Sequence, residues 1–478
     1  MPNQYPEGSF DADAPAALSQ SVLDEFSAAG ISYETAVKSR AEHGRDWWPL
    51  SIGVVASGKV PHWPGVVVYP TSTEQVSAVV RIANEHKVSV TAQGGRSGVL
   101  GGAVPLDGAI ALDLTRLSTI HELDETSGTI RVQAGVFGPE LEEFASARGW
   151  TIGHFPQSFD LATVGGWIAC RGAGQLSNRY GKIEDMVRAL TVVLANGEVL
   201  ELGGHGPRQA VGPDLTALFV GSEGTLAIIT EETLVARRLA TYEQRAAFRF
   251  ENFEEGLDAC RRILQRDASP AVLRLYDATE SMRNFEIPGC VLIVLDEGGQ
   301  GFVEAAFEIV NEECASATRL DVTLVEKWRE RRNDVSALAP LWERGYVVDT
   351  LEVAGPWSIL MTMYHEVTTA LGSIEGMFVA SVHQSHAYLD GACLYFTFAA
   401  KPEGDVEEFY RRAWDVATRA VLASGGALSH HHGVGRNRAR FVREALGSGY
   451  DVLVAMKREL DPNNILNPGA LGIGAPPW

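Results

Sequence analysis

Apolar residues in the first third of the chain follow two spacings, which predict a β-α-β unit and then more strands. An apolar run at 66–68 precedes a segment, 76–83, in which valine and alanine recur every three or four positions, the spacing of one helix face. A second strand-like run, 88–91, leads directly into a glycine-rich loop. Two further apolar runs, at 110–114 and 129–133, predict strands that continue the same domain.

Changes in this pattern divide the chain into four segments. Residues 1–60 are polar and favour helices, so we expect a helical N-terminal extension. Residues 61–238 contain the strand-like runs and three glycine-rich loops and form the first predicted domain. From 239 to 425 strands alternate with helices, which predicts a second, α+β domain that caps the first and binds substrate. Residues 426–478 form a C-terminal segment with a histidine cluster and an amphipathic stretch.

Composition narrows the class of protein. Hydrophobic residues make up 45% of the 478 residues and charged residues 21%, which is typical of a globular protein with more than one domain. The formal net charge of −21 argues against a nucleic-acid binder, because no basic stripe is present to neutralise phosphates. The five cysteines form no CxxC pair, which indicates reduced thiols. No apolar run is long enough for a transmembrane segment and no secretion signal is evident, so we expect a cytoplasmic protein whose partner is a small molecule.

Glycine is unusually frequent, with 49 copies, and three clusters of it stand out at 93–102, 163–174 and 221–226. Glycine-rich turns expose backbone N–H groups, and a row of such donors binds an anion such as a pyrophosphate. Neither the G-x-G-x-x-G fingerprint of Rossmann domains nor the P-loop pattern G-x-x-x-x-G-K-[ST] is present. The loops therefore predict a large phosphate-bearing cofactor that is held in neither of those two ways.

Several motifs together identify the type of cofactor domain. They lie at 93–102, 156–174, 180–185, 206–214, 221–226 and 429–435. In this combination the chain resembles the vanillyl-alcohol oxidase superfamily with its PCMH-type FAD-binding domain, and more narrowly the alkyldihydroxyacetonephosphate synthase family. The resemblance implies an α+β fold: a two-subdomain FAD-binding domain, an α+β cap domain and a C-terminal segment that returns to the flavin. It also implies FAD as cofactor and allows a homodimer.

The resemblance carries the family's cofactor contacts over to positions that match its motifs. Those expected along the FAD pyrophosphate are Gly94, Gly95, Ser97 and Gly98. Those expected along the rest of the cofactor are Ser158, Thr163, Arg171, Ala173, Glu223, Thr225 and Ile229. Arg96 stands where relatives have glycine, or histidine in members that bind flavin covalently, so we expect non-covalent FAD and count Arg96 among the cofactor contacts.

Three consecutive histidines, His430, His431 and His432, are the most unusual local feature. A surface run, a metal site and an acid–base cluster are the alternatives. Consecutive side chains point in different directions, which makes one metal with three adjacent ligands awkward, and we expect no metal. Imidazoles titrate near neutral pH, and the run matches a motif of the synthase family, so we favour an active-site role.

Three more residues occupy positions that the family uses for catalysis or substrate binding. Tyr395 matches the catalytic tyrosine, although a half-buried strand aromatic is the plainer interpretation. Arg274 matches a substrate-site arginine that is also expected to take part in catalysis. His383 stands where the family has a second substrate-site arginine, and this change removes one bidentate clamp for phosphate.

Two enzymatic reactions and one non-enzymatic role follow from these features. The resemblance implies that the acyl group of an acyl-dihydroxyacetone phosphate-like substrate is exchanged for a fatty alcohol through a flavin N5 adduct, which makes the substrate lipid-like. The alternative is an FAD-dependent dehydrogenase or oxidase of a 2-hydroxy acid or alcohol, in which a histidine takes the hydroxyl proton. A non-catalytic flavin-binding protein would need no set of titratable groups beside the cofactor.

Overall fold

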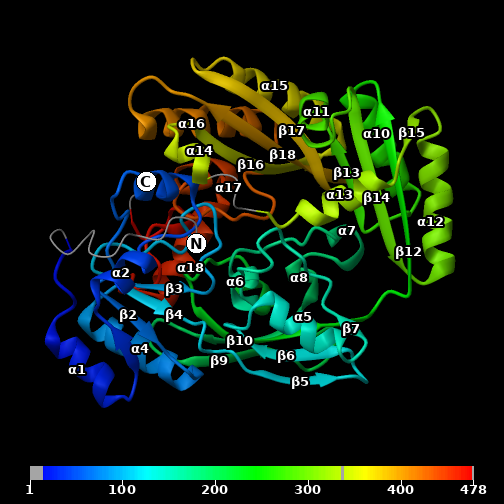
Figure 1. The fold of residues 1–478 in the computed structure, drawn as a ribbon. Coiled ribbons are helices and arrows are strands. Elements are labelled where there is room, and N and C mark those ends of the chain that lie inside the picture. The colour runs from blue at the N-terminus through cyan, green and yellow to red at the C-terminus, as the bar shows by residue number, and fades with distance from the viewer. Residues whose placement is uncertain (1–13, 335–338, 476–478) are drawn as a thin grey trace.

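The computed structural model describes residues 14–334 and 339–475 and has three main sheets (Figure 1). The first sheet has the strand order β1-β2-β4-β3. Its strands are β1 (Ser32–Glu34), β2 (Val66–Tyr69), β3 (Val90–Gln93) and β4 (Ile110–Asp113). β2 and β3 both run parallel to β4, and α4 (Thr73–His86) connects them, so the predicted β-α-β unit is confirmed. α4 begins at 73 because the Ser72 side chain accepts the backbone N–H of Gln75 at 3.3 Å.

The N-terminal segment is built into this first sheet. Residues 14–60 form α1 (Gln20–Ala28), β1, α2 (Val37–His43) and α3 (Pro49–Ala56). The helical extension expected over 1–60 contains these helices and also a strand, because β1 pairs antiparallel with β2 and makes this segment part of the first sheet; residues 1–13 lie outside the described residues. The Trp48 indole donates to the hydroxyl of Tyr410 in the cap at 3.0 Å, which joins the segment to the second domain as well.

The second sheet is antiparallel and has the order β5-β6-β10-β8-β9. Its strands are β5 (Ile120–Asp124), β6 (Thr129–Gln133), β8 (Val187–Val193), β9 (Val199–Gly203) and β10 (Ile228–Val235). The helices of this part are α5 (Gly138–Ser146), α6 (Val164–Ala169), α7 (Ser177–Tyr180), α8 (Ile183–Met186) and α9 (Thr216–Phe219), and β7 (Trp150–Thr151) pairs with β11 (Arg237–Arg238). The two sheets form the lower half of the molecule in Figure 1.

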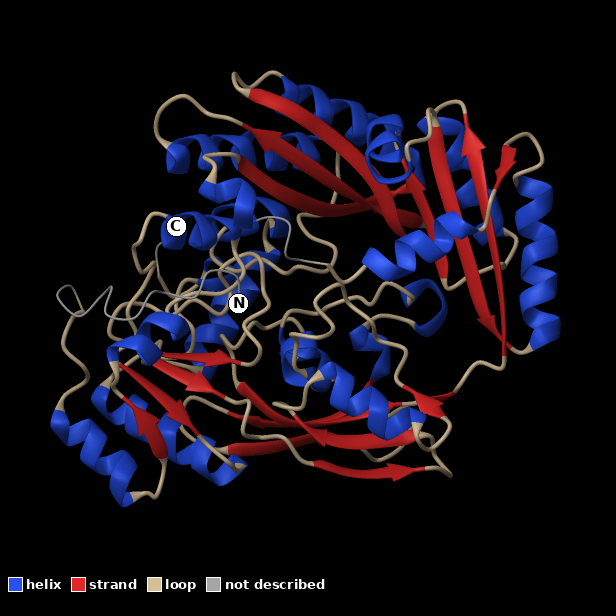
Figure 2. Cartoon of the chain, in the orientation of Figure 1, coloured by secondary structure: helices blue, strands red, loops and turns tan. Residues whose placement is uncertain are grey.

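The cap is built on one seven-stranded antiparallel sheet with the order β15-β12-β14-β13-β17-β18-β16. The strands are β12 (Tyr242–Phe250), β13 (Val272–Tyr276), β14 (Cys290–Gly298), β15 (Thr318–Leu320), β16 (Val347–Pro356), β17 (Met377–Ala387) and β18 (Gly391–Ala400). The helices are α10 (Phe253–Gln265), α11 (Ala278–Phe285), α12 (Gln300–Glu313), α13 (Thr323–Arg331), α14 (Ala339–Glu343), α15 (Leu360–Gly372) and α16 (Val406–Ala423). Loops and short helices lie between the cap sheet and the two lower sheets (Figure 2).

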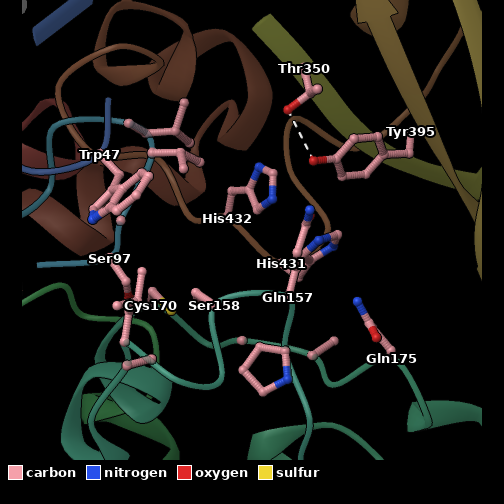
Figure 3. A pocket seen from close by; sticks show the side chains of 18 of the residues that line it. Trp47, Ser97, Gln157, Ser158, Cys170, Gln175, Thr350, Tyr395, His431 and His432 are labelled. Atoms are coloured by element: carbon pink, nitrogen blue, oxygen red, sulfur yellow. Dashed lines mark hydrogen bonds between the residues drawn. The ribbon is translucent and has the colours of Figure 1, made fainter. Parts of the chain in front are cut away.

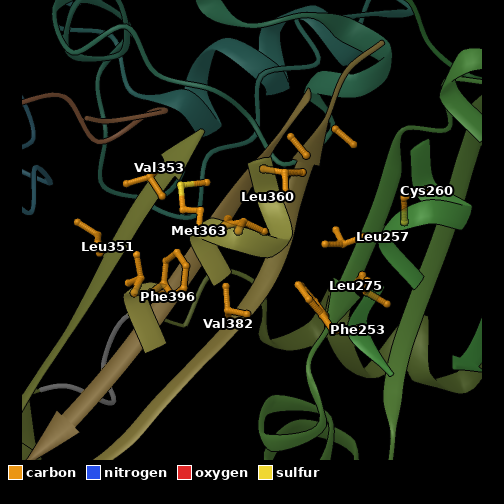
Figure 4. Packing of buried hydrophobic residues seen from close by; sticks show 14 of the residues in the cluster. Phe253, Leu257, Cys260, Leu275, Leu351, Val353, Leu360, Met363, Val382 and Phe396 are labelled. Carbon is orange, nitrogen blue, oxygen red and sulfur yellow. The ribbon is translucent and has the colours of Figure 1, made fainter. Parts of the chain in front are cut away.

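The largest hydrophobic core lies between the cap sheet and its outer helices (Figure 4). Phe253 and Leu257 of α10 and Met363 of α15 pack against strand residues such as Val382 and Phe396. These side chains are at most 4% exposed. The outer face of the cap sheet is therefore filled by its helices, and its inner face is left to meet the FAD-binding domain.

The C-terminal segment, which was expected to return to the flavin, packs beside the first sheet of the FAD-binding domain. It contains α17 (Val442–Leu446) and α18 (Gly449–Leu460). Its end lies beside β3, where the Val90 N–H donates to the Ile465 carbonyl at 2.7 Å and the Asn467 N–H donates to the Val90 carbonyl at 2.8 Å. The predicted fold class is confirmed. In the described part of the chain, every helix is too short or too polar to span a lipid bilayer.

Candidate active site

A cavity of about 520 Å³ lies between the FAD-binding domain and the cap. Its walls come from the glycine loop at 94–103, the segment 154–175, the inner face of the cap sheet and the histidine loop after α16. Figure 3 shows Tyr395 and Thr350 of the cap on one side of it and Ser97 and Ser158 on the other. This volume falls in the usual range for a small-molecule or cofactor site.

The glycine loop has the properties of a pyrophosphate cradle. The backbone N–H groups of residues 94–98 donate to no acceptor within the described residues, and they border the cavity. The loop also packs tightly on the start of α6: a Cβ on Gly94 would lie 2.2 Å from Thr163 Oγ1, and one on Gly95 would lie 1.6 Å from the Leu161 carbonyl oxygen. Residues 94–98 are at most partly buried, and a row of unpaired backbone N–H groups that faces a cavity is suited to bind an anion. The loop therefore fits the diphosphate of FAD.

Arg96 sits in this loop with a left-handed backbone, φ 51°. Its guanidinium lies 3.3 Å from Asp113, the last residue of β4. His43 contacts the same carboxylate at 2.9 Å. Arg96 lines the cavity, but its charge is already balanced by a protein carboxylate.

The other expected cofactor residues divide into two groups. Those that line the cavity are Gly94, Gly95, Ser97, Gly98, Ser158, Thr163, Ala173 and Glu223. The structure does not bring Arg171, Thr225 or Ile229 to its wall. Arg171 is 62% exposed and pairs with Glu184 at 3.3 Å, Thr225 donates to the Ser222 carbonyl at 2.7 Å, and Ile229 is in the core of the second sheet.

Glu223 also supports the histidine loop. Its carboxylate accepts the backbone N–H groups of Val434 and Gly435 at 2.6 and 2.8 Å. Burial raises the pKa of Glu223 to about 7 against these hydrogen bonds. Glu223 thus ties the loop that follows the histidines to the cavity wall.

The histidine loop is fixed by a second buried carboxylate, that of Glu352 on β16. Glu352 accepts the Ser429 hydroxyl at 2.6 Å and the three backbone N–H groups of 430–432 at 3.2, 3.0 and 2.7 Å. It also forms an ion pair with Arg438, and both side chains are fully buried. Burial would raise the pKa of Glu352, but Arg438 and the nearby histidines hold it well below its usual value. The sequence analysis missed both residues of this pair.

The three histidines have different surroundings. His431 and His432 line the cavity, whereas His430 lies behind them, with its Nε2 2.8 Å from the Tyr388 hydroxyl. His432 Nδ1 lies 3.5 Å from Glu352. Burial lowers the pKa of His432, and Glu352 opposes that shift. His432 is therefore a neutral imidazole at neutral pH whose protonated form a carboxylate can stabilise, which suits a general base.

A grouping of imidazoles was not expected from the sequence. Ring nitrogens of His386, His430 and His431 lie within 4.8 Å of one another. Each ring already has a partner: His386 Nδ1 contacts the Ser177 hydroxyl at 2.8 Å, and the Nδ1 atoms of His430 and His431 are 2.9 Å apart. Hydrogen bonds within the protein account for the arrangement of these rings.

Tyr395 lies on β18 beside the histidines. Its hydroxyl donates to Thr350 Oγ1 at 3.0 Å (Figure 3). Its ring stacks on that of His383 with centres 4.8 Å apart. Burial raises the pKa of Tyr395, so the phenol remains protonated at neutral pH, and it donates its one proton to Thr350.

Arg274 and His383 belong to one hydrogen-bonded chain. His383 Nδ1 lies 2.7 Å from Glu280, and the Arg274 guanidinium lies 3.1 Å from His383 Nε2. Because arginine can only donate, His383 Nε2 accepts from Arg274, and the protonated Nδ1 donates a hydrogen bond to Glu280. Burial opposes ionisation of Glu280, but His383 and Arg283 lower its pKa to about 2. Both nitrogens of His383 are thus engaged, and the residue orients Arg274.

Comparison with known proteins agrees with this geometry. The family model described as an FAD binding domain matches residues 64–203, and that of the C-terminal domain of FAD-linked oxidases matches 239–471. An FAD-linked oxidoreductase of Escherichia coli (strain K12), YgcU, is 32% identical over 85% of this chain and 89% of its own length. Alkyldihydroxyacetonephosphate synthase of Dictyostelium discoideum is 28% identical over 87% of this chain and 74% of its own.

Other relatives and solved structures widen the range of reactions. D-lactate dehydrogenase of Anaerostipes hadrus is 28% identical over 85% of this chain and 89% of its own length. A structure of alkyldihydroxyacetonephosphate synthase aligns with a TM-score of 0.81 at 26% identity, over 95% of this chain and 86% of the other. One of p-cresol methylhydroxylase aligns with a TM-score of 0.75 at 18% identity, over 96% and 98%, which shows a shared fold. The chain belongs to the FAD-linked oxidoreductase family and is an FAD-dependent enzyme with an FAD-binding domain followed by an FAD-linked oxidase C-terminal domain.

Proposed function

We propose that the protein is a dehydrogenase or oxidase that removes a hydride from a small hydroxy compound with an anionic group, such as a 2-hydroxy acid. The observation that carries this proposal is the wall that the cap contributes to the cavity. Its described side chains are charged, polar or aromatic, and none of them is aliphatic. Such a wall suits a short polar substrate and provides no aliphatic surface for a long alkyl chain.

The residues of the site have distinct roles in this proposal. Bound FAD supplies the hydride acceptor, and an external electron acceptor then takes up the two electrons. His432 takes the hydroxyl proton of the substrate, because it is neutral and faces Glu352 at 3.5 Å. The Tyr395 hydroxyl turns from Thr350 to donate its hydrogen bond to the substrate oxygen, and Arg274, oriented by His383, binds the anionic group.

FAD binding is proposed to be non-covalent at the glycine loop. The side chain at the position that carries the covalent link in some relatives is Arg96, which is not a nucleophile. It is held by Asp113 at 3.3 Å. A histidine at this position would be needed for the bond that those relatives form.

The second candidate is the exchange reaction of alkyldihydroxyacetonephosphate synthases. It is favoured by the alignment over 95% of the chain at a TM-score of 0.81 and by the three consecutive histidines beside Tyr395. It would also use Tyr395 and the histidines to move protons. It requires space for a fatty acyl or alkyl chain, and the cap wall of the cavity does not favour this.

The experiment that separates the two candidates is a substrate screen with an artificial electron-accepting dye. We expect the FAD-loaded protein to reduce the dye with at least one short 2-hydroxy acid or phosphorylated alcohol, and not with neutral alcohols of equal length. No dye reduction with any anionic compound, together with incorporation of a labelled fatty alcohol into acyl-dihydroxyacetone phosphate, would reject the first candidate in favour of the second.

A further inference from the structure

Two partly buried guanidinium groups of the cap line the cavity without a carboxylate partner among the described residues, in addition to the exposed Arg331 at the end of α13. One is Arg274 on β13, and the other is Arg332, which directly follows α13. Neither forms an ion pair with any carboxylate in the described ranges. The Nε atom of Arg274 is buried and has no hydrogen-bond partner there. In a chain with a net charge of −21, two such cations in one cavity are unusual.

Both arginines pack on the same aromatic side chain. The guanidinium carbons of Arg274 and Arg332 lie 5.8 and 5.7 Å from the ring centre of Trp328, so the two carbons are at most about 12 Å apart. Arg332 also lies 5.6 Å from the ring of Phe155 in the FAD-binding domain. Contact with aromatic faces orders a guanidinium but leaves its N–H donors free for an acceptor.

The neighbouring charges do not neutralise this pair. Among the other cations of the cap wall, Arg283 is already bound to Glu280 at 2.9 Å, and Lys327 and Arg331 are exposed. Burial and Arg329 lower the pKa of Arg332, and Glu297 and Asp160 oppose that shift from a distance without a hydrogen bond to it. A partly buried cation of this kind is stabilised when an anion binds beside it.

We infer that Arg274 and Arg332 together bind the oxyanion group of the substrate, a phosphate or a carboxylate. Arg332 would then supply, from the end of α13, the second guanidinium that the synthase family has at the position of His383. His383 itself is committed to Glu280 and Arg274 and has no donor left. The inference rests on the proposed function for the identity of the substrate, but the site binds anions whether or not hydride transfer occurs.

The test is a binding titration of the FAD-loaded protein with two anions that do not reduce flavin, inorganic phosphate and oxalate. Binding is followed by the change in the visible flavin spectrum. The variants are R332Q, R332K and R274Q. The control is R443Q, which removes an arginine whose side chain is 68% exposed on α17. FAD content is measured for every variant, so that loss of the cofactor is not mistaken for loss of the anion.

R332Q is expected to raise the dissociation constant of the more tightly bound anion at least tenfold, since one charge-assisted pair contributes about 1.4 kcal/mol or more. R332K keeps the positive charge but not the planar guanidinium, so its affinity for the anion should fall by less. R443Q should bind both anions as tightly as the wild type. If R332Q does not retain FAD, R332K is used in its place, and its affinity for the anion is expected to fall threefold to tenfold. Preference for phosphate would indicate a phosphorylated substrate, and preference for oxalate a 2-hydroxy acid.

The inference is overturned if neither probe binds the wild-type protein, or if R332Q binds both within threefold of wild type. Its failure is distinct from failure of the proposed function. Anion binding that depends on Arg332, without flavin reduction by any hydroxy compound, rejects the function and keeps the site. Flavin reduction with unchanged anion binding in R332Q rejects the site alone.

Discussion

The buried carboxylate of Glu352 should be the most sensitive single position for stability outside the cavity. The change E352Q removes its charge and keeps its shape. In the wild type this carboxylate accepts three consecutive backbone N–H groups of the histidine loop and pairs with Arg438. The amide oxygen of glutamine can still accept hydrogen bonds from the loop. The charge of Arg438, which is fully buried, would then lose the carboxylate with which it forms an ion pair.

The size of the effect follows from that burial. Removal of one partner from a fully buried ion pair costs about 3–5 kcal/mol, because the remaining charge is left in a medium of low polarity. The control is D451N, which breaks the pair between Arg443 and Asp451. These two side chains are 68% and 71% exposed, and an exposed pair contributes at most about 1 kcal/mol.

The assay is urea unfolding followed by circular dichroism at one fixed excess of FAD, because the cofactor itself stabilises the folded state. We expect E352Q to reduce the free energy of unfolding by about 3–5 kcal/mol and D451N by less than about 1 kcal/mol. A loss in E352Q no larger than that in D451N would show that Arg438 is neither desolvated nor dependent on Glu352.

Three further predictions concern the cofactor and the chemistry. G95A should weaken FAD binding at least about tenfold, because the new Cβ would lie 1.6 Å from the Leu161 carbonyl oxygen. The control G372A has no atom within 4 Å of its new Cβ and should bind FAD normally. Equal FAD-to-protein ratios in the two purified variants would contradict this prediction. Y395F should keep FAD and lower kcat by about a hundredfold or more, since it removes a positioned donor, and an unchanged kcat would exclude Tyr395 from catalysis. The rate should also depend on the protonation of His432, whose pKa burial lowers and Glu352 raises. Because the neutral form is the base, kcat/KM should rise with pH with an apparent pKa below about 6.5 and stay level at higher pH. This apparent pKa should be lower in E352Q. A rise of kcat/KM with an apparent pKa above about 6.5 would argue against His432 as the base.

Much of the cofactor domain could be predicted from local sequence patterns. The β-α-β unit follows from the apolar spacing around Val76 and Val79, and the glycine loop follows from the residues after β3. Both features depend on neighbours close in the chain. β1 was missed because three residues, Ser32–Glu34, carry too short a pattern, and its pairing with β2 depends on a contact between distant segments.

The site could be predicted only in part. The family motifs pointed to His431, His432, Tyr395 and Arg274, and all four line the cavity. A motif gives a place in the chain and not the direction of a side chain, which is why Arg171 points to solvent.

The supporting residues had no signal in the sequence at all. Glu352 precedes His430 by 78 positions in an ordinary apolar strand, and its role depends on how β16 packs against the histidine loop. Glu280 and Arg332 likewise reach the site only through the fold of the cap.

We propose that the enzyme oxidises a small anionic hydroxy compound. The most direct test of this proposal is anaerobic mixing of the FAD-loaded protein with the best substrate of the dye screen and with the same compound deuterated at the reacting carbon. The account predicts that the visible flavin absorbance bleaches in one turnover and does so more slowly with the deuterated compound. Flavin that stays oxidised with every anionic hydroxy compound, while fatty alcohol exchanges into acyl-dihydroxyacetone phosphate, would contradict it.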